Sequence, residues 1–233
     1  MTLRTALRLG RVSNLPTVWT NVMAGTALAG AALRPSVLVP LALAMSLLYV
    51  AGMYLNDAFD AGWDAQHRPE RPIPSREASR GAVLGGGFGL LAAGLALVAL
   101  VGGGRGALGA GALAGLILLY DAVHKQTPIA PVIMGACRAA VYVVAALAVG
   151  VSPLPARLWV GAGLLLLYIV VVSAIARREA ADPRARGLVA PLIAGISLLD
   201  GTLLVLTGHP VAAALTVAAF FQTRAWQHHV PGT

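Results

Sequence analysis

The stretch LVPLALAMSLLYVAGMYLNDAFDAGWD, residues 38–64, changes from purely apolar to acidic within a few positions. No charged residue occurs from Leu38 to Leu55, and three aspartates follow before the stretch ends. An apolar run of this length approaches the ~20 residues with which a helix spans a bilayer. The stretch therefore predicts a membrane-spanning helix that ends in a polar site.

The overall composition also indicates a membrane protein. Of 233 residues, 58% are hydrophobic and 11% are charged, whereas about a quarter of the residues in soluble domains are charged. The runs lack the alternation of apolar and polar residues that marks a transmembrane β-barrel. The 27 glycines favour helices that pack closely through small residues. We therefore predict an all-α, polytopic membrane helix bundle that forms one integral-membrane domain over residues 1–233.

Turn-forming residues divide the chain into apolar runs, and each run is close to the length of one span. We therefore expect about eight transmembrane helices. The runs cover residues 15–33, 36–55, 82–101, 106–122, 130–150, 157–176, 188–207 and 209–223.

The charged residues predict an orientation. Thirteen of the 17 basic residues fall in segments on the side of the N-terminus, three fall on the other side, and Arg138 lies inside a run. The positive-inside rule then predicts a multi-pass cell-membrane protein with both termini in the cytoplasm. The net charge of +8 indicates attraction to membrane lipid rather than nucleic-acid binding. Eight of the nine acidic residues face the same side, which predicts a central cavity open to the cytoplasm.

The acidic stretch has a spacing that indicates its chemistry. On a continuing helix, Asn56, Asp57, Asp60 and Asp64 share an arc of about 100°, and Arg68 follows close to it. Carboxylate oxygens suit Mg²⁺, which commonly reaches substrates through phosphate oxygens, and arginine forks match phosphate. The pattern predicts a diphosphate site. The alternative is a solvated loop in which the charges pair with each other.

Several segments resemble the UbiA-type intramembrane prenyltransferases. NDAFDAGWD (residues 56–64) resembles their NDxxDxxxD motif, and RPERPIPS (68–75) resembles the segment after it. RVSNLPTVWTNVMAG (11–25), YDAVHK (120–125) and CRAAVY (137–142) resemble further family segments in the same order. The resemblance implies a helix bundle around a central cavity with a lateral opening to lipid. It also implies Mg²⁺-dependent transfer of an isoprenyl chain from its diphosphate to an acceptor.

The resemblance implies roles for individual residues. Lys125 is the only lysine of the chain. It is either a diphosphate ligand or a helix-end lysine whose side chain reaches the membrane interface. His124 is the alternative residue that could occupy the position of the lysine in the family segment. The expected Mg²⁺ ligands are Asp57, Asp60 and Asp64, the expected diphosphate ligands are Asn56, Arg68, Lys125 and Arg178, and the expected catalytic residues are Asp57, Asp60, Asp64, Lys125 and Arg138.

The sequence departs from the family in two places. The region of the second acidic motif reads ARREAADPRARG (176–187), where Glu179 and Asp182 are the only carboxylates. They are either ligands of a second Mg²⁺ or ordinary loop charges. The family usually has nine spans, so a neighbouring subunit could complete the cavity wall in a homo-oligomer.

Two charged residues lie within apolar runs, Arg138 and Asp200. Each costs ~2.5–3.5 kcal/mol at the bilayer centre on insertion scales, so each is expected to face the cavity or to pair with the other. In the first case Arg138 binds a carboxylate or phosphate of the acceptor. Asn14 either lines the acceptor pocket or caps the first helix. The expected acceptor-binding residues are Asn14, Asn21, Tyr120 and Arg138.

The function predicted from the sequence is prenyl transfer to a small aromatic or polar acceptor within the membrane. A first alternative is a related terpene cyclase, in which the cation formed from the same diphosphate attacks its own double bonds. A second alternative is a non-catalytic membrane carrier.

Overall fold

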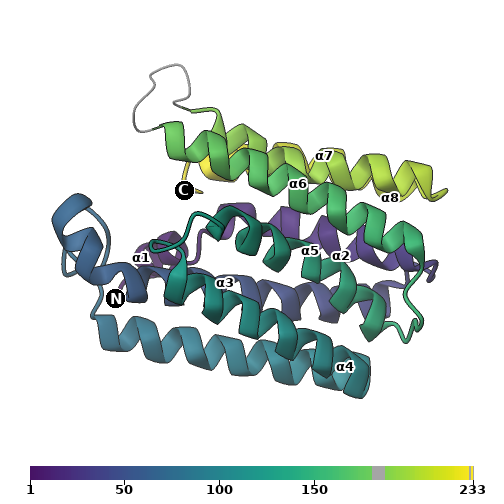
Figure 1. The fold of residues 1–233 in the computed structure, drawn as a ribbon, viewed down its shortest axis with the longest axis horizontal. Helices are drawn as coiled ribbons and strands as arrows, with labels where there is room; N and C mark the ends of the chain where they lie inside the picture. Colours follow the sequence, from purple (N-terminus) through teal and green to yellow (C-terminus); the bar gives the residue numbers. More distant parts are fainter. Residues whose placement is uncertain (180–186, 231, 233) are drawn as a thin grey trace.

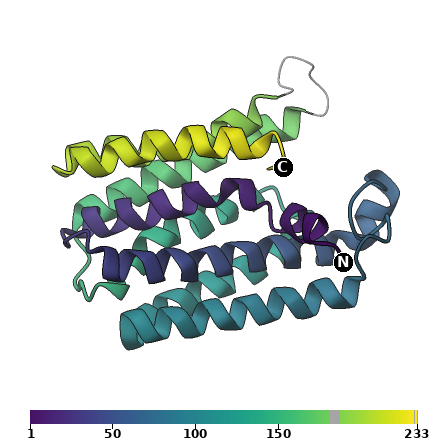
Figure 2. The same cartoon turned by 180° about the vertical axis from the view of Figure 1, so that it is seen from behind.

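The computed structural model describes residues 1–179, 187–230 and 232, and their regular structure is entirely helical. Long helices lie side by side in a bundle, and the two termini lie at the same end (Figures 1 and 2). In chain order the elements are α1 (Leu3–Leu9), the 3₁₀ helix η1 (Val12–Asn14), α2 (Leu15–Ala29), α3 (Pro35–His67), α4 (Arg80–Val123), α5 (Ala130–Ala148), α6 (Ala156–Glu179), α7 (Val189–Leu206) and α8 (Pro210–Gln227).

The long element α4 is two helices joined at Gly103, whose backbone is not helical (φ 58°, ψ −159°). Arg80, at its start, donates to the carbonyl of Ala58, and Asp121, near its end, accepts a hydrogen bond from Asn56. Both ends of α4 therefore lie against the same part of α3, so the chain reverses at Gly103 (Figure 1). Glycine suits this position because it adopts positive φ at no steric cost.

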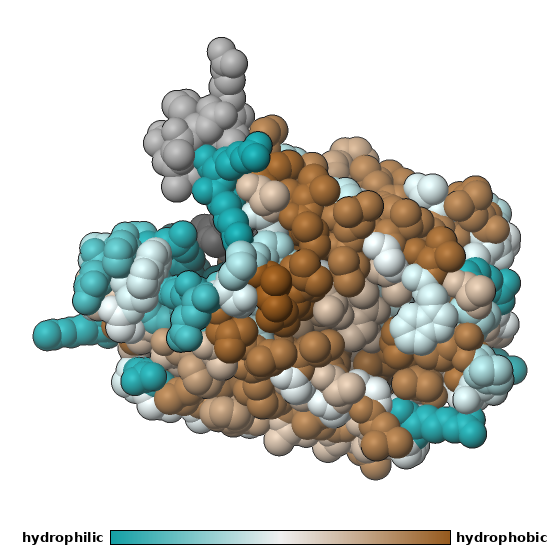
Figure 3. Space-filling view, in the orientation of Figure 1, coloured by the Kyte–Doolittle hydropathy of each residue, from teal (hydrophilic) through white to brown (hydrophobic). Residues whose placement is uncertain are grey.

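Five helices, α3 to α7, are long and apolar enough to cross a membrane. Because α4 contains two of the predicted runs, these helices account for six of the eight. The other two runs correspond to α2, which has 15 residues, and α8, which has 18. Large apolar side chains such as Leu100, Leu206 and Val211 are more than three-quarters exposed. In Figure 3 the apolar surface covers the flanks of the bundle, while hydrophilic residues gather mainly at its ends. The structure confirms a polytopic helical membrane protein.

The helix α2 contributes to two groups of core residues. Val18 and Val22 pack with α3, α4 and α5, whereas Ala24 and Leu28 pack with α5, α6 and α7. Gly25 allows this close approach, because a Cβ built there would lie 2.6 Å from Cα of Tyr142. The position of α2 brings residues from both halves of the chain to one interior.

We expect Gly25→Ala to destabilise the bundle, because the added methyl group meets the backbone of α5. Overpacking of this kind costs about 1–3 kcal/mol. The control is Gly111→Ala, where nothing lies within 4 Å of the added Cβ and helix propensity favours alanine. Thermal unfolding of both variants in detergent tests the prediction. Equal midpoints for the two variants would contradict the packing described here.

Candidate active site

Asp57 lies near the C-terminal end of α3, and two arginines hold its carboxylate. Its Oδ1 is 3.0 Å from Nη1 of Arg71 and 3.3 Å from Nη2 of Arg11. Arg71 comes from the loop after α3, and Arg11 from the turn between α1 and η1, where it adopts a left-handed backbone (φ 42°). Neither arginine was predicted as a ligand from the sequence. Arg71 lies within the segment after the aspartate motif, and Arg11 is the first residue of another segment with family resemblance. These positions were the sequence signals by which both arginines could have been predicted.

Asp60 is paired with the segment that follows α4. Its Oδ1 is 2.9 Å from Nζ of Lys125, and its Oδ2 is 3.2 Å from Nε2 of His124. Burial lowers the pKa of His124, but the hydrogen bond and charge of Asp60 outweigh it and raise the pKa overall. Nζ of Lys125 also lies 3.9 Å from the ring centroid of Trp63. Both residues considered for the basic position therefore contact the same carboxylate.

Two predicted residues of this region make fewer contacts. Asp64 is buried, and its carboxylate makes no hydrogen bond or ion pair with the described residues. The guanidinium of Arg68 lies 5.7 Å from the ring centroid of Trp63 and makes no ion pair with a described carboxylate. Arg71 therefore takes the place at the aspartate motif that the sequence suggested for Arg68.

A second set of contacts joins the two segments that supply these arginines. The carboxylate of Glu77, in the loop after α3, accepts a hydrogen bond from Thr5 of α1 at 3.0 Å and pairs with Arg8 at 3.1 Å. The hydrogen bond from Thr5 and the charge of Arg8 lower the pKa of Glu77. This link holds the N-terminal segment beside the loop, so Arg11 and Arg71 approach Asp57 together.

Basic side chains gather around the aspartate motif. Arg11, Arg71 and Lys125 contact the carboxylates of Asp57 and Asp60, and the carboxylate of Asp64 lies in the same electrostatic environment. Burial first, and then the nearby charge of Arg11, lower the pKa of Arg71, as expected where cations crowd together. Guanidinium forks match phosphate oxygens, so the arginines offer donors to a phosphate group.

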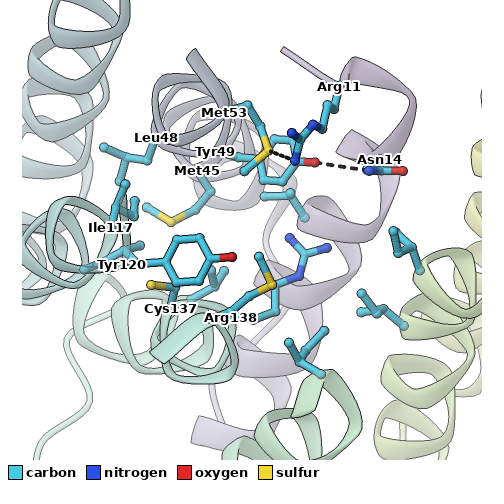
Figure 4. A pocket seen from close by; sticks show the side chains of 18 of the residues that line it. Arg11, Asn14, Met45, Leu48, Tyr49, Met53, Ile117, Tyr120, Cys137 and Arg138 are labelled. Carbon is cyan, nitrogen blue, oxygen red and sulfur yellow. Dashed lines mark hydrogen bonds between the residues drawn. The ribbon is translucent and has the colours of Figure 1, made fainter. Parts of the chain in front are cut away.

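A cavity of about 190 Å³ lies next to this cluster. Figure 4 shows Arg11 at its edge and Arg138 and Tyr120 pointing into it from other helices. Arg11 therefore belongs both to the carboxylate cluster and to the cavity wall. The polar residues of the wall are Arg11, Asn14, Tyr49, Tyr120, Asp121 and Arg138, and its apolar residues are Val18, Met45, Leu48, Met53, Leu113, Ile117, Met134, Val141, Ile169, Ile193 and Ile196.

Arg138 faces this cavity, as one of the two interpretations of the sequence predicted. Its guanidinium donates a hydrogen bond to Oγ1 of Thr17 and lies 5.7 Å from the ring centroid of Tyr49. Asp200 makes no ion pair with it. The carboxylate of Asp200 is fully buried and accepts hydrogen bonds from Thr20, Asn21 and Tyr142 instead.

The remaining predicted acceptor residues separate into two groups. Tyr120 and Asn14 line the cavity, whereas Asn21 lies outside its lining and binds Asp200 at 2.8 Å. Asn14 makes no side-chain capping hydrogen bond. Its Nδ2 donates to Oη of Tyr49 and to the carbonyl of Gly232. The alternative prediction, in which the side chain of Asn14 caps the first helix, is therefore wrong.

The second acidic region contributes less to the described site. Arg178 lies in the last turn of α6, where it is exposed and makes no contact with the described carboxylates. Glu179 is the last residue of α6, and the structure describes its backbone position only. Asp182 lies outside the described residues.

The first motif has the donor chemistry that Mg²⁺ requires. Asp57 and Asp60 present hard oxygens about one helical turn apart on α3. No described side chain donates to Oδ2 of Asp57. Among the described residues, no three carboxylate, imidazole or thiol groups converge into a metal site. The two aspartates therefore fit Mg²⁺ as partial ligands, and water or phosphate oxygens would complete the shell.

The helix bundle, with a cluster of basic and acidic side chains beside a largely apolar cavity, defines a polytopic helical membrane protein. The model of the UbiA prenyltransferase family matches residues 17–226, and the chain belongs to this family.

Known proteins with similar sequences are archaeal digeranylgeranylglyceryl phosphate synthases. The protein of Methanoregula boonei is 42% identical over 83 residues, which cover 35% of this chain and 29% of the relative. The protein of Methanopyrus kandleri is 32% identical over 155 residues, which cover 66% of this chain and 56% of the relative. Each match therefore covers less than two thirds of the relative.

Among solved structures, a UbiA homologue from Archaeoglobus fulgidus bound to DMAPP and Mg²⁺ has the same fold. Its TM-score is 0.63 at 18% identity, over 96% of this chain and 86% of that one. At this identity the similarity establishes the fold alone.

Proposed function

We propose that this protein transfers an isoprenyl group from a diphosphate donor to a small acceptor within the membrane. The observation that carries the proposal is the cation-rich cluster around Asp57 and Asp60 beside an apolar cavity. The names of the two archaeal relatives and the DMAPP and Mg²⁺ bound by the Archaeoglobus structure support it.

In this proposal the diphosphate binds at the cluster and the hydrocarbon chain lies in the cavity. Arg11, Arg71 and Lys125 would bind phosphate oxygens by charge-assisted hydrogen bonds. Mg²⁺, held by Asp57 and Asp60, would neutralise the developing charge of the leaving diphosphate. The apolar wall, which includes Met45 and Ile117, would hold the isoprenyl chain and exclude water. An allylic carbocation formed there would survive long enough to meet the acceptor.

The polar residues deeper in the cavity support an acceptor with an anionic group. Arg138 makes no ion pair with a carboxylate of the described residues, and its half-buried guanidinium donates a hydrogen bond to Thr17. A cation that is partly removed from water and lacks a counter-ion binds an anion favourably. A phosphate or carboxylate on the acceptor would supply this anion. A cyclase, which needs no second substrate, gives no role to Arg138, so the transferase is favoured.

We also propose that the charged end of the bundle faces the cytoplasm. Thirteen of the 17 basic residues lie in segments expected on that side, and the positive-inside rule orients such a chain with those segments inside the cell. Oligomer formation stays a prediction.

The test of the function is product analysis with purified protein in lipid nanodiscs. Labelled dimethylallyl, geranyl and geranylgeranyl diphosphates are supplied with Mg²⁺, alone and with geranylgeranylglyceryl phosphate or an aromatic carboxylate. We expect labelled acceptor product with at least one pair, and none in excess chelator. A cyclic hydrocarbon formed without acceptor would establish the cyclase instead. Full recovery of every donor would contradict both.

We expect Arg138→Gln to raise KM for an anionic acceptor by about 10–100-fold, because a hydrogen bond to a charged group contributes ~1.5–3 kcal/mol. The effect on KM for the donor is expected to be smaller. Arg105→Gln is the control, because Arg105 is exposed and lies next to the reversal at Gly103, far along α4 from both of the ends that approach the aspartate motif. Steady-state kinetics with both substrates measures the effect. An equal rise of the two KM values would argue against an acceptor site at Arg138.

A further inference from the structure

Asp121 differs from the three aspartates of the motif in its surroundings. It lies near the end of α4, is 5% exposed and lines the cavity. Asp57 and Asp60 make ion pairs, whereas Asp121 makes none with the described residues; Asp64 also makes none, but it does not line the cavity. Its neighbours with ionisable groups are Arg11, His124, Asp60, Tyr120 and Cys137.

The two oxygens of Asp121 are not equivalent. Oδ1 accepts a hydrogen bond from Nδ2 of Asn56 at 3.1 Å. Oδ2 is buried and has no hydrogen-bond partner. Leaving a buried carboxylate oxygen unpaired costs free energy, so a group that donates a proton or a hydrogen bond to it would be bound favourably. The hydrogen bond from Asn56 fixes the orientation of the carboxylate, while Oδ2 has no hydrogen-bond donor among the described residues.

We propose that Asp121 is a catalytic residue that accepts the proton of a hydroxyl acceptor during transfer, an inference that rests on the proposed function. In this step the C1–O bond of the donor breaks, and its electron pair leaves with the diphosphate. The hydroxyl oxygen of the acceptor donates a lone pair to C1. The O–H bond of the acceptor breaks, and its proton moves to the carboxylate of Asp121. The products are an ether, diphosphate and a protonated Asp121, which returns the proton to water when the ether leaves.

The other carboxylates are less suited to this role. Arg11, Arg71 and Lys125 already contact Asp57 and Asp60, and neither these two aspartates nor Asp64 belongs to the cavity lining. Asp121 lies at the junction between Asn56 of the aspartate motif and the cavity that holds the acceptor residues Tyr120 and Arg138. Its carboxylate is the one that the described cavity wall offers to an acceptor hydroxyl.

Asp121→Asn separates this role from a positioning role. The oxygen of an asparagine side chain still accepts the hydrogen bond from Asn56, but the group no longer takes a proton. We measure diphosphate release and prenylated product from geranylgeranyl diphosphate and geranylgeranylglyceryl phosphate with Mg²⁺. We expect product formation to fall by about 100-fold or more, the usual contribution of a positioned base. Diphosphate release should fall less than about tenfold, with the excess donor recovered as prenyl alcohol.

Asp121→Glu is the second variant, because it keeps a carboxylate and is expected to recover product above the level of Asp121→Asn. Thermal unfolding confirms that both variants are folded. If Asp121→Asn loses diphosphate release and product formation equally, Asp121 only positions other groups, and the inference is overturned. If the variant loses no product, the diphosphate takes the proton, and the inference is overturned as well. A wild-type protein that releases diphosphate but alkylates no hydroxyl overturns it too. Only a wild-type protein that releases no diphosphate would contradict the proposed function as well as this inference.

Discussion

Asp57→Asn is expected to lower Mg²⁺-dependent diphosphate release by about 100- to 1,000-fold, the usual cost of removing a group that stabilises developing charge. The variant keeps the shape of the side chain but removes its charge. Arg11 and Arg71, 3.3 Å and 3.0 Å from Oδ1 of Asp57, then face each other without their common counter-ion. The variant also lacks one of the two carboxylates proposed to hold Mg²⁺.

The matched control for this variant is Glu70→Gln, which removes a carboxylate from the exposed loop after α3. The two variants change the net charge equally, so a general electrostatic effect would appear in both. Release of labelled diphosphate is measured across a Mg²⁺ titration. Asp57→Asn with the same rate and Mg²⁺ dependence as Glu70→Gln would show that the aspartate motif is not the diphosphate site.

The second large effect is expected at the fully buried Asp200. Asp200→Leu leaves the hydroxyl of Tyr142 and the amide of Asn21 without their acceptor, and Thr20 loses one of its acceptors. Each buried donor without a partner costs about 1–3 kcal/mol, so the variant should lose at least about 2 kcal/mol. For a chain of this size the melting temperature would fall by roughly 4–8 °C. These donors come from α2 and α5, which carry the cavity residues Val18 and Arg138.

Two companion variants identify the cause of that loss. Asp200→Asn keeps one acceptor oxygen and is expected to be intermediate. Thr202→Val changes an exposed residue of the same helix, whose hydroxyl donates to the backbone carbonyl of Leu198 one turn earlier. This variant is expected to be nearly neutral. Thermal unfolding in detergent compares the three. A melting temperature of Asp200→Leu equal to that of Thr202→Val would mean that the network does not hold α2, α5 and α7 together.

The features that could be predicted from the sequence are those determined by local pattern. Apolar runs of nearly constant length predict the helices, and Gly102-Gly103-Gly104 marks the reversal within α4. The aspartates of α3 share one face because the helix continues beyond the apolar run to His67. Because a charge within the membrane costs free energy, Arg138 could be predicted to face the cavity.

The contacts that could not be predicted join residues far apart in the chain. Arg11 reaches Asp57 across 46 positions, and Asn56 reaches Asp121 across 65. Helical periodicity gives the face of a residue but not which side chain of another element arrives there. For this reason the contact of Arg71 with Asp57 was not predicted, while Arg68, which follows the motif in helical register, stays a predicted diphosphate ligand. Asn21 was predicted for the cavity for the same reason, and it instead binds the carboxylate of Asp200.

The most direct test of the central claim is a structure of the protein with an isoprenyl thiolodiphosphate and Mn²⁺, located by anomalous scattering. We expect Mn²⁺ bound by oxygens of Asp57 and Asp60, with Arg11, Arg71 and Lys125 on the diphosphate and the hydrocarbon chain between Met45 and Ile117. A diphosphate bound at the opposite end of the bundle, or Mn²⁺ remote from both aspartates, would contradict the account.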